Sequence, residues 1–354
     1  MAIIKIEEKY EYLKDVLLSI LLIAIAFVVN AGMSIRGLYQ DDLFMWSTRR
    51  GVGFFKYVFP DQTRKFRPVY WIVAWIYQGI LKNNLFLIVP INIFIAAIIA
   101  LGVYFFAKKM AKSRGLAFTL SAMFLISRFS YYNIGQFLGV MEAMAIVFAL
   151  GMLYFLYIYI NGGKNISFYY ACILYFLNCF THERFIVLLP MLLFAVIVRK
   201  GKRILNFLVS LLTFASIIVI RLLALKSLVP EGTGGSKVSE TFKMSDFFHS
   251  LRTEILYLLG INTGPEHLNG INFKDVNLAI KFIIVIGILA LLGFCIKSVY
   301  SVIIYNKKID LHWIENTLLF IGFIIGSVVS SAVTIRVEMR WLYAPYLFML
   351  LLLA

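Results

Sequence analysis

The residues best suited to chemistry are two adjacent carboxylates, Asp41 and Asp42, which lie a few residues beyond the first long apolar run, residues 16–33. Acids so close to hydrocarbon are uncommon, because burying their charge is costly. A catalytic base or a metal ligand at the mouth of a lipid-facing cavity would explain them, and a pair allows one carboxylate to assist the other. The competing interpretation is a helix cap beside a solvated acid, since Asp is a favoured cap.

Other polar residues also stand within or at the ends of apolar runs. They are Arg67, Arg128, Glu142, His182, Glu183, Arg184, Glu266, His267, Glu338 and Arg340. We expect the Glu142 carboxylate to face a cavity or Arg128, because an unpaired acid on a spanning helix costs a few kcal/mol. For some of these residues a structural role is the alternative to a functional one. Residues 181–184 could be an interfacial hinge, and Glu338 and Arg340 could form a weak local ion pair. The spacing of His182 and Glu183 does not indicate a zinc site.

The composition sets the class of protein that must position these residues. Of the 354 residues, 62% are hydrophobic, and the mean hydropathy is +0.88. The apolar runs lack the alternation of a barrel, so the sequence predicts an all-α, polytopic transmembrane helix bundle in one domain, residues 1–354. The net charge of +16 favours anionic lipid head groups as partners and argues against nucleic acid. The three cysteines fall in apolar runs and are interpreted as packing residues.

The apolar runs and basic clusters predict about ten spans, with outer-face interfacial helices between some of them. The expected spans are residues 16–33, 85–107, 116–132, 137–160, 167–180, 185–198, 204–225, 278–300, 317–334 and 341–353. Lys5, Lys9 and Lys14 precede the first span, which predicts a cytoplasmic N-terminus. Four clusters then fall outside, at the surface of the plasma membrane: Asp41-Asp42, His182-Glu183-Arg184, Glu266-His267 and residues 336–340.

Two outer loops are expected, residues 34–84 and 226–276, and each contains a predicted surface helix. The first of these helices, residues 68–81, is rich in Trp and Tyr and begins with Pro68, which is well placed at a helix start. The second, residues 245–259, opens with Ser245 as an expected cap. Ahead of Pro68, the first loop carries seven Lys and Arg residues against three acids, contrary to the positive-inside rule, which suggests phosphate recognition.

Four motifs together resemble the C-type (GT-C) superfamily of polytopic membrane glycosyltransferases. They are Gln40-Asp41-Asp42; Phe66-Arg67-Pro68-Val69 ahead of Ile91-Asn92; Thr181-His182-Glu183-Arg184 followed by Pro190; and Val337-Glu338-Met339-Arg340-Trp341-Leu342-Tyr343-Ala344-Pro345. The second is similar to the mannosyltransferase-like members. Two motifs depart from the family pattern, with His182 in place of the usual Lys and Trp341 in place of the first Tyr. The resemblance covers most of the chain, although each motif alone has low specificity.

The resemblance implies transfer of a sugar from a polyprenyl-phosphate donor to a glycan, lipid or protein acceptor on the extracytoplasmic side, with inversion at the anomeric carbon. Asp41 or Asp42 would be the catalytic base, in a site reached by solvent, and Arg67, Arg184 and Arg340 would bind the donor phosphate. His182 and Glu183 would shape the pocket, and Arg128, Glu266, His267 and Glu338 are further substrate-binding candidates. The sequence leaves open whether a divalent cation, Mg²⁺ or Mn²⁺, binds at Asp41 or Asp42.

Two other function classes fit many of the same features. A flippase or transporter of lipid-linked saccharides would also carry outer cations and an intramembrane Glu142, but related halves are expected in a transporter and the sequence shows no internal repeat. A polymerase or ligase of lipid-linked glycans would use a pyrophosphate donor, and the long loop at residues 226–276 suits it. A receptor or scaffold would not need so many charges in the same region.

Overall fold

The computed structural model describes residues 2–35, 37–38, 40–49, 51–60, 65–82, 84–199, 201, 203–226, 242–264, 270–305 and 311–354. These residues form helices and connecting turns and contain no β-strand, which confirms the predicted all-α class. The α-helices are α1 (Ala2–Val29), α2 (Gln40–Ser47), α3 (Phe54–Val58), α4 (Pro68–Leu81), α5 (Ile88–Ala111), α6 (Arg114–Ile126), α7 (Tyr131–Gly135), α8 (Gly139–Ile160), α9 (Asn165–Cys179), α10 (Leu189–Val198), α11 (Arg203–Leu225), α13 (Met244–Leu258), α14 (Leu278–Tyr305), α15 (Leu311–Ala332) and α16 (Met339–Leu352).

Among the described residues, five helical segments are long and apolar enough to cross a membrane. They are Tyr10–Val29, Leu85–Ala111, Gly139–Ile160, Arg203–Leu225 and Leu311–Ala332. Of the other expected spans, residues 278–300 fall within the long helix α14, and the rest correspond to shorter or interrupted helices. The run at residues 116–132, for example, is divided into α6, a 3-10 turn at Arg128–Ser130, and α7. A membrane-embedded bundle therefore has support from these helices, and the count of about ten spans stays a prediction.

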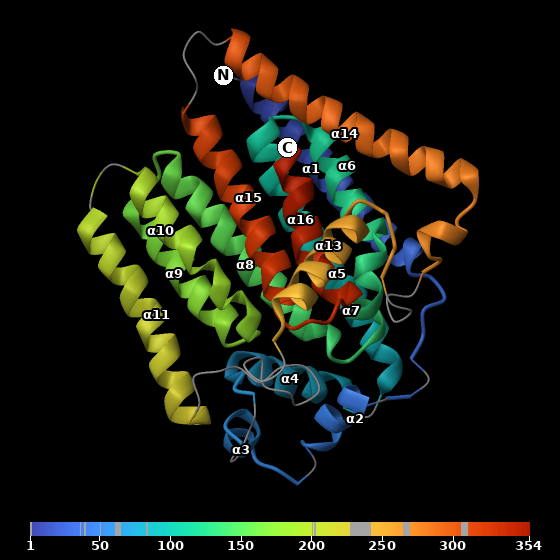
Figure 1. The fold of residues 1–354 in the computed structure, drawn as a ribbon, viewed down its shortest axis with the longest axis vertical. Helices are drawn as coiled ribbons and strands as arrows, with labels where there is room; N and C mark the ends of the chain where they lie inside the picture. Colours follow the sequence, from blue (N-terminus) through green and yellow to red (C-terminus); the bar gives the residue numbers. More distant parts are fainter. Residues whose placement is uncertain are drawn as a thin grey trace.

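The helices form one bundle with a separate layer of short helices at one end (Figure 1). Helices α8, α9, α10 and α11 lie together on one side, and α15 and α16 pass through the middle. The short helices α2, α3 and α4 lie across the end of the bundle at which α8 and α16 begin. Helix α14 runs obliquely along the outside, and its Phe282 and Ile283 side chains are 60% and 68% exposed, as a lipid-facing helix requires.

The two predicted surface helices form, with one correction. Helix α4 spans the predicted residues and has Pro68 at its first position, which confirms that prediction. Helix α13 also forms, but its N-cap is Lys243, so the expected Ser245 cap is wrong; the Ser245 hydroxyl instead donates to the Asp246 carboxylate. Helix α13 packs against α15 and buries a polar face toward it, while Phe248 and Ile255 are exposed on the other side. Its apolar face is therefore turned outward, which suits contact with lipid.

The opposite end of the bundle is held by a separate ionic cluster. Asp15 on α1 accepts hydrogen bonds from Tyr104 Oη (2.7 Å) and Arg114 Nε (2.9 Å) and forms an ion pair with Lys108. These contacts join α1, α5 and α6. Lys108 and Arg114 therefore contribute to the packing of α5 and α6 against α1.

Candidate functional site

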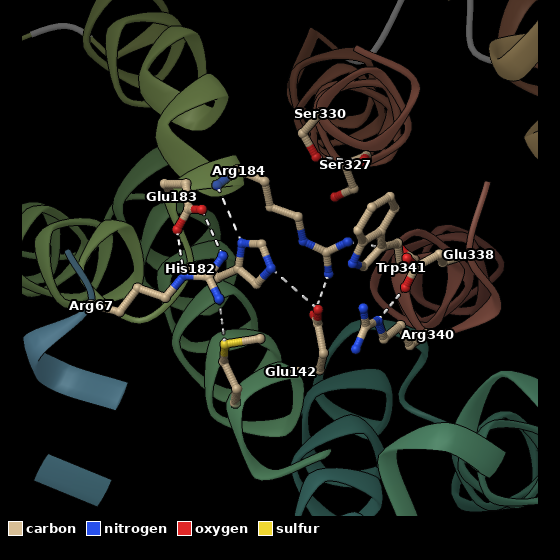
Figure 2. A network of polar contacts seen from close by, with 11 residues as sticks. Arg67, Glu142, His182, Glu183, Arg184, Ser327, Ser330, Glu338, Arg340 and Trp341 are labelled. Atoms are coloured by element: carbon tan, nitrogen blue, oxygen red, sulfur yellow. Dashed lines mark hydrogen bonds and ion pairs between the residues drawn. The ribbon is translucent and has the colours of Figure 1, made fainter. Parts of the chain in front are cut away.

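The first turn of α8 carries a buried acid that two residues of the connection between α9 and α10 contact. Glu142 Oε2 accepts a hydrogen bond from Arg184 Nη2 at 2.6 Å, and Glu142 Oε1 lies 3.4 Å from His182 Nε2 (Figure 2). Arg184 also donates from Nη1 to the Trp341 carbonyl at 3.4 Å, which reaches α16. Glu142 was expected to face a cavity or Arg128, and its close partners are Arg184 and His182 instead of Arg128. Arg128 starts the 3-10 turn after α6 and interacts electrostatically with Tyr257 of α13.

A second ion pair joins the first loop to the same connection. Arg67 Nε and Nη2 donate to the two oxygens of Glu183, each at 2.6 Å, in the bidentate geometry that guanidinium and carboxylate groups favour. Arg67 Nη1 lies 3.0 Å from the Met141 sulfur. Arg67 is also the N-cap residue of α4, so this pair anchors the start of that helix to the bundle. Burial alone would raise the pKa of Glu183, but the Arg67 guanidinium holds it well below the usual range.

The third pair lies at the start of α16. Glu338 is the N-cap residue of that helix and is 8% exposed, and its carboxylate pairs with Arg340 Nε and with Arg336 Nε, the latter at 2.8 Å. The side chain of Arg340 is 19% exposed. No hydrogen bond from its Nη1 or Nη2 group to another described residue is found, so these donors could receive an anion.

The two aspartates of α2 have different surroundings. Asp42 is 9% exposed, and its Oδ2 and Oδ1 accept hydrogen bonds from the backbone N–H groups of Phe137 (3.0 Å) and Leu138 (2.8 Å). Burial raises the pKa of Asp42, and the two backbone N–H groups and Arg340 oppose that shift. Asp41 is exposed, next to Asp42 in the first turn. The expectation that solvent reaches both carboxylates is therefore wrong for Asp42, which connects α2 to the turn before α8.

The turn before α8 is held in place by contacts with α5 and α4. Asn92 on α5 donates to the Ile134 (3.0 Å) and Gln136 (2.8 Å) carbonyls, and Phe137 stacks on Tyr77 of α4 with ring centroids 5.4 Å apart. Gly139 is needed because a Cβ there would lie 1.8 Å from the Asn133 carbonyl oxygen. The turn therefore fixes the start of α8 relative to α4 and α5, and with it the position of Glu142.

Electrostatic interactions connect these groups into one cluster, which we call the charged cluster: Asp41, Asp42, Lys65, Arg67, Glu142, His182, Glu183, Arg184, Glu338 and Arg340. Asp42 interacts with both Arg340 and Asp41. Lys65 interacts with Arg67, Glu183 and Asp41. The structure thus brings together most of the residues that the sequence marked as candidates. Glu266 and His267 lie outside the described residues.

The arginines of the charged cluster differ in their capacity to bind an anion. Both donors on one edge of Arg67 are occupied by Glu183, and Arg184 uses Nη1 and Nη2 on Trp341 and Glu142. A phosphate bound directly by Arg67 or Arg184, as expected from the sequence, would have to compete with these existing hydrogen bonds. Among the described residues, the Nη1 and Nη2 donors of Arg340 have no hydrogen-bond partner, whereas the Arg184 donor without a partner is the buried Nε.

Two buried charged residues near the charged cluster were not selected from the sequence. Glu254 on α13 is fully buried, accepts a hydrogen bond from Ser331 Oγ at 2.7 Å, and interacts electrostatically with Arg184. Arg221 on α11 is 8% exposed and interacts electrostatically with Glu183 and Arg67. Glu254 lies in an amphipathic pattern that predicts an ordinary surface helix, on which an acidic residue is not a signal. Arg221, however, interrupts an apolar run, and that signal could have marked it.

The residues present do not define a metal centre. Among the described residues, no group of three or more His, Cys, Asp or Glu side chains is placed to hold a metal ion. Both oxygens of Asp42 already accept backbone hydrogen bonds, which leaves exposed Asp41 as the better candidate ligand of the pair.

The protein is expected to lose stability at mildly acidic pH, because His182 binds a proton more readily in the unfolded chain than in the folded one. Burial, with the nearby Arg67 charge, lowers the pKa of His182 from 6.5 to about 4. Between those values the unfolded chain binds a proton that the folded chain does not, so the free energy of unfolding should fall by up to about 3 kcal/mol from pH 6.5 to pH 4. Unfolding measured across this range should show a weaker decline in His182→Gln. An equal decline in both proteins would contradict the assignment.

Glu254 should give a pH dependence of the opposite sign. Burial raises its pKa from 4.5 to about 8, against the opposing Ser331 hydrogen bond and Arg184 charge. The unfolded chain loses this proton between pH 4.5 and pH 8 while the folded chain keeps it, so wild-type stability falls as pH rises through that window. Glu254→Gln should match wild type near pH 4.5 and be about 2–5 kcal/mol more stable at pH 8. Identical pH profiles would show that Glu254 is not buried as a neutral acid.

A search against models of known protein families finds no match to this chain, and a search of curated proteins finds none.

Proposed function

We propose that this protein is a membrane glycosyltransferase that moves a sugar from a polyprenyl-phosphate donor to an acceptor hydroxyl. The observation that carries the proposal is the charged cluster, in which exposed Asp41 precedes Asp42 in the first turn of α2 and Asp42 interacts electrostatically with Arg340. Residues from five separate segments contribute to it. Ion pairs hold three of these segments together, through Arg67 with Glu183 and through Arg184 with Glu142, as a site that must align a base with a leaving group requires.

The proposed reaction divides the work between the two aspartates. Asp41 accepts the proton of the acceptor hydroxyl as the acceptor oxygen bonds to C1 of the sugar. The bond between C1 and the phosphate oxygen breaks, and the electron pair leaves with the lipid phosphate. Asp42 keeps Asp41 in position through the Phe137 and Leu138 amides. A single displacement inverts the anomeric carbon. A glycan, lipid or protein hydroxyl would serve as acceptor.

The leaving phosphate gains charge during the reaction, and Arg340 is the group proposed to stabilise it. Guanidinium donors bind phosphate oxygens well, and their effect is larger where water is excluded. Glu338 holds Arg340 through Nε, which orients the two remaining nitrogens. A divalent cation bound at Asp41 is compatible with the same chemistry. We place the site on the extracytoplasmic face of the plasma membrane, from the distribution of Lys and Arg.

Arg340→Ala should weaken binding of the donor by about tenfold or more, because a charge-assisted hydrogen bond contributes about 1.5–3 kcal/mol. The measurement is saturation binding of a fluorescent polyprenyl-phosphate sugar to the purified protein. Arg336→Ala is the matched control, since Arg336 pairs with the same Glu338 carboxylate but is 48% exposed. Equal affinity in wild type and Arg340→Ala would remove Arg340 from the phosphate site.

The proposed activity is tested with purified protein in detergent, a radiolabelled short-chain polyprenyl-phosphate sugar and a panel of acceptors. Release of polyprenyl phosphate together with a labelled acceptor supports a glycosyltransferase. Saturable donor binding without release in any condition would contradict it and favour a lipid-linked saccharide flippase. Turnover of a pyrophosphate-linked glycan alone would favour a polymerase or ligase.

A further inference from the structure

One side of α4 is turned toward the start of α8. Tyr70 follows Arg67 by three positions and precedes Tyr77 by seven, so the three side chains lie on the same side of the helix. Arg67 Nη1 lies 3.0 Å from the sulfur of Met141 on α8, and the Tyr77 ring stacks on Phe137, just before α8. Tyr70 therefore lies between these two contacts and faces the charged cluster at the start of α8.

The hydroxyl of Tyr70 has no hydrogen-bond partner among the described residues. Tyr70 is 1% exposed, and its Oη atom is buried. By contrast, Tyr77 Oη donates to the Asn92 side-chain oxygen at 2.9 Å. A buried tyrosine hydroxyl usually finds a partner, and one without a partner is costly. Burial also raises the pKa of Tyr70 well above its ordinary value, so the hydroxyl keeps its proton and can donate it to a ligand.

The charges around Tyr70 favour a ligand group that both accepts and donates a hydrogen bond. Tyr70 interacts electrostatically with Asp42 and Arg67. The Asp42 carboxylate would repel a phosphate oxygen, and the Nε and Nη2 donors of Arg67 are taken by Glu183. Each Asp42 oxygen accepts one backbone hydrogen bond, so each can accept a second. A hydroxyl group, which can accept from Tyr70 and donate to a carboxylate oxygen, therefore fits these surroundings better than a phosphate does.

We propose that Tyr70 determines substrate specificity by binding a hydroxyl group of a sugar substrate, with Asp42 as the second partner of that hydroxyl. This inference rests on the proposed function, because it assumes that a sugar is bound at Asp41. A sugar held at exposed Asp41 would extend one hydroxyl inward past Asp42, which is 9% exposed, to Tyr70. A site of this kind rejects an analogue that lacks the hydroxyl, because the buried polar groups of the protein are then left unpaired.

The test is binding of short-chain polyprenyl-phosphate glucose, mannose and galactose to the purified protein in lipid nanodiscs, with polyprenyl phosphate that carries no sugar as the comparison ligand. Tyr70→Phe should weaken binding of the preferred sugar lipid by about 2- to 10-fold, the effect of one neutral hydrogen bond, and leave polyprenyl phosphate binding unchanged. One monodeoxy form of the same sugar lipid should bind wild type more weakly by a similar factor. Tyr70→Phe should bind that deoxy form as tightly as wild type does, which identifies the hydroxyl.

Tyr104→Phe is the matched control. It removes a hydroxyl at the opposite end of the bundle, where Tyr104 Oη donates to Asp15 at 2.7 Å. This variant should unfold more easily than wild type and bind the sugar lipids as wild type does. Tyr70→Phe loses no hydrogen bond to a described residue, so it should show the opposite pattern, with unchanged unfolding and weaker binding.

The same variant distinguishes a hydroxyl of the donor sugar from a hydroxyl of a glycan acceptor. If Tyr70→Phe leaves donor affinity unchanged and raises the KM of a glycan acceptor in the transfer assay, the hydroxyl belongs to the acceptor. If it changes neither, or weakens polyprenyl phosphate as much as the sugar lipid, the inference is overturned and the proposed function stands. If wild type binds none of the sugar lipids, the proposed function is overturned as well.

Discussion

Replacing Asp41 by Asn is expected to reduce sugar transfer by about 10²- to 10⁴-fold, the range that a positioned general base contributes. The fold should be retained, since Asp41 is exposed and the substitution preserves its shape. The turnover number and the free energy of unfolding, measured on the same preparation, separate these effects. Donor affinity should change little, because the base acts on the acceptor.

Asp42→Asn is the comparison that separates the roles of the two acids. An Asn amide nitrogen cannot accept a hydrogen bond, so one of the Phe137 and Leu138 N–H groups would lose its partner. We expect a loss of about 1–3 kcal/mol in the free energy of unfolding in addition to any loss of activity. An Asp41→Asn protein that keeps more than half of the wild-type turnover number would overturn the assignment of Asp41 as base.

The largest effect on stability is expected from Arg67→Ala. This change leaves the largely buried Glu183 carboxylate, 14% exposed, without its bidentate partner, and removal of one member of a buried pair costs about 3–5 kcal/mol. It also frees the start of α4 from the connection that carries His182 and Arg184. Unfolding by titration of a denaturing detergent, followed by circular dichroism, measures the loss.

Two further variants show whether the loss arises from the ion pair. In the double variant Arg67→Met with Glu183→Leu, no charge is left unpaired, and most of the stability should return. Arg49→Ala removes another arginine of the same loop, which stacks on Trp75 with 4.4 Å between the guanidinium and the ring centroid, and should cost only about 1 kcal/mol. Equal losses for Arg67→Ala and Arg49→Ala would contradict the structural role of the pair.

The sequence predicted the helical class and several helices because these depend on local patterns. The length of each apolar run identified α5, α8 and α11, and Pro68 with the aromatic run after it predicted the bounds of α4. The run at residues 116–132 was wrongly predicted to be one helix. Its hydropathy is high throughout, so the apolar pattern gives no sign of a break. The structure nevertheless ends the helix there, because the backbone turns at Ser127 and Arg128.

The sequence predicted which residues belong to the site better than it predicted which of them contact one another. Adjacent aspartates point about 100° apart on a helix, and only the turn at Phe137 and Leu138 determines that Asp42 is the buried one. The partner of Glu142 could not be chosen between Arg128 and Arg184 by sequence distance, because both stand near apolar ends. Arg67 and Glu183 are 116 positions apart, so their pairing depends on the packing of α4 against the bundle.

The most direct test of the central claim is a transfer assay with protein reconstituted into sealed liposomes and the labelled polyprenyl-phosphate sugar supplied on one face at a time. We expect polyprenyl phosphate and a labelled acceptor to appear at the face that carries Asp41, with at least a hundredfold lower rate in Asp41→Asn. Equal release by wild type and Asp41→Asn, or movement of intact donor across the membrane without release, would contradict the account.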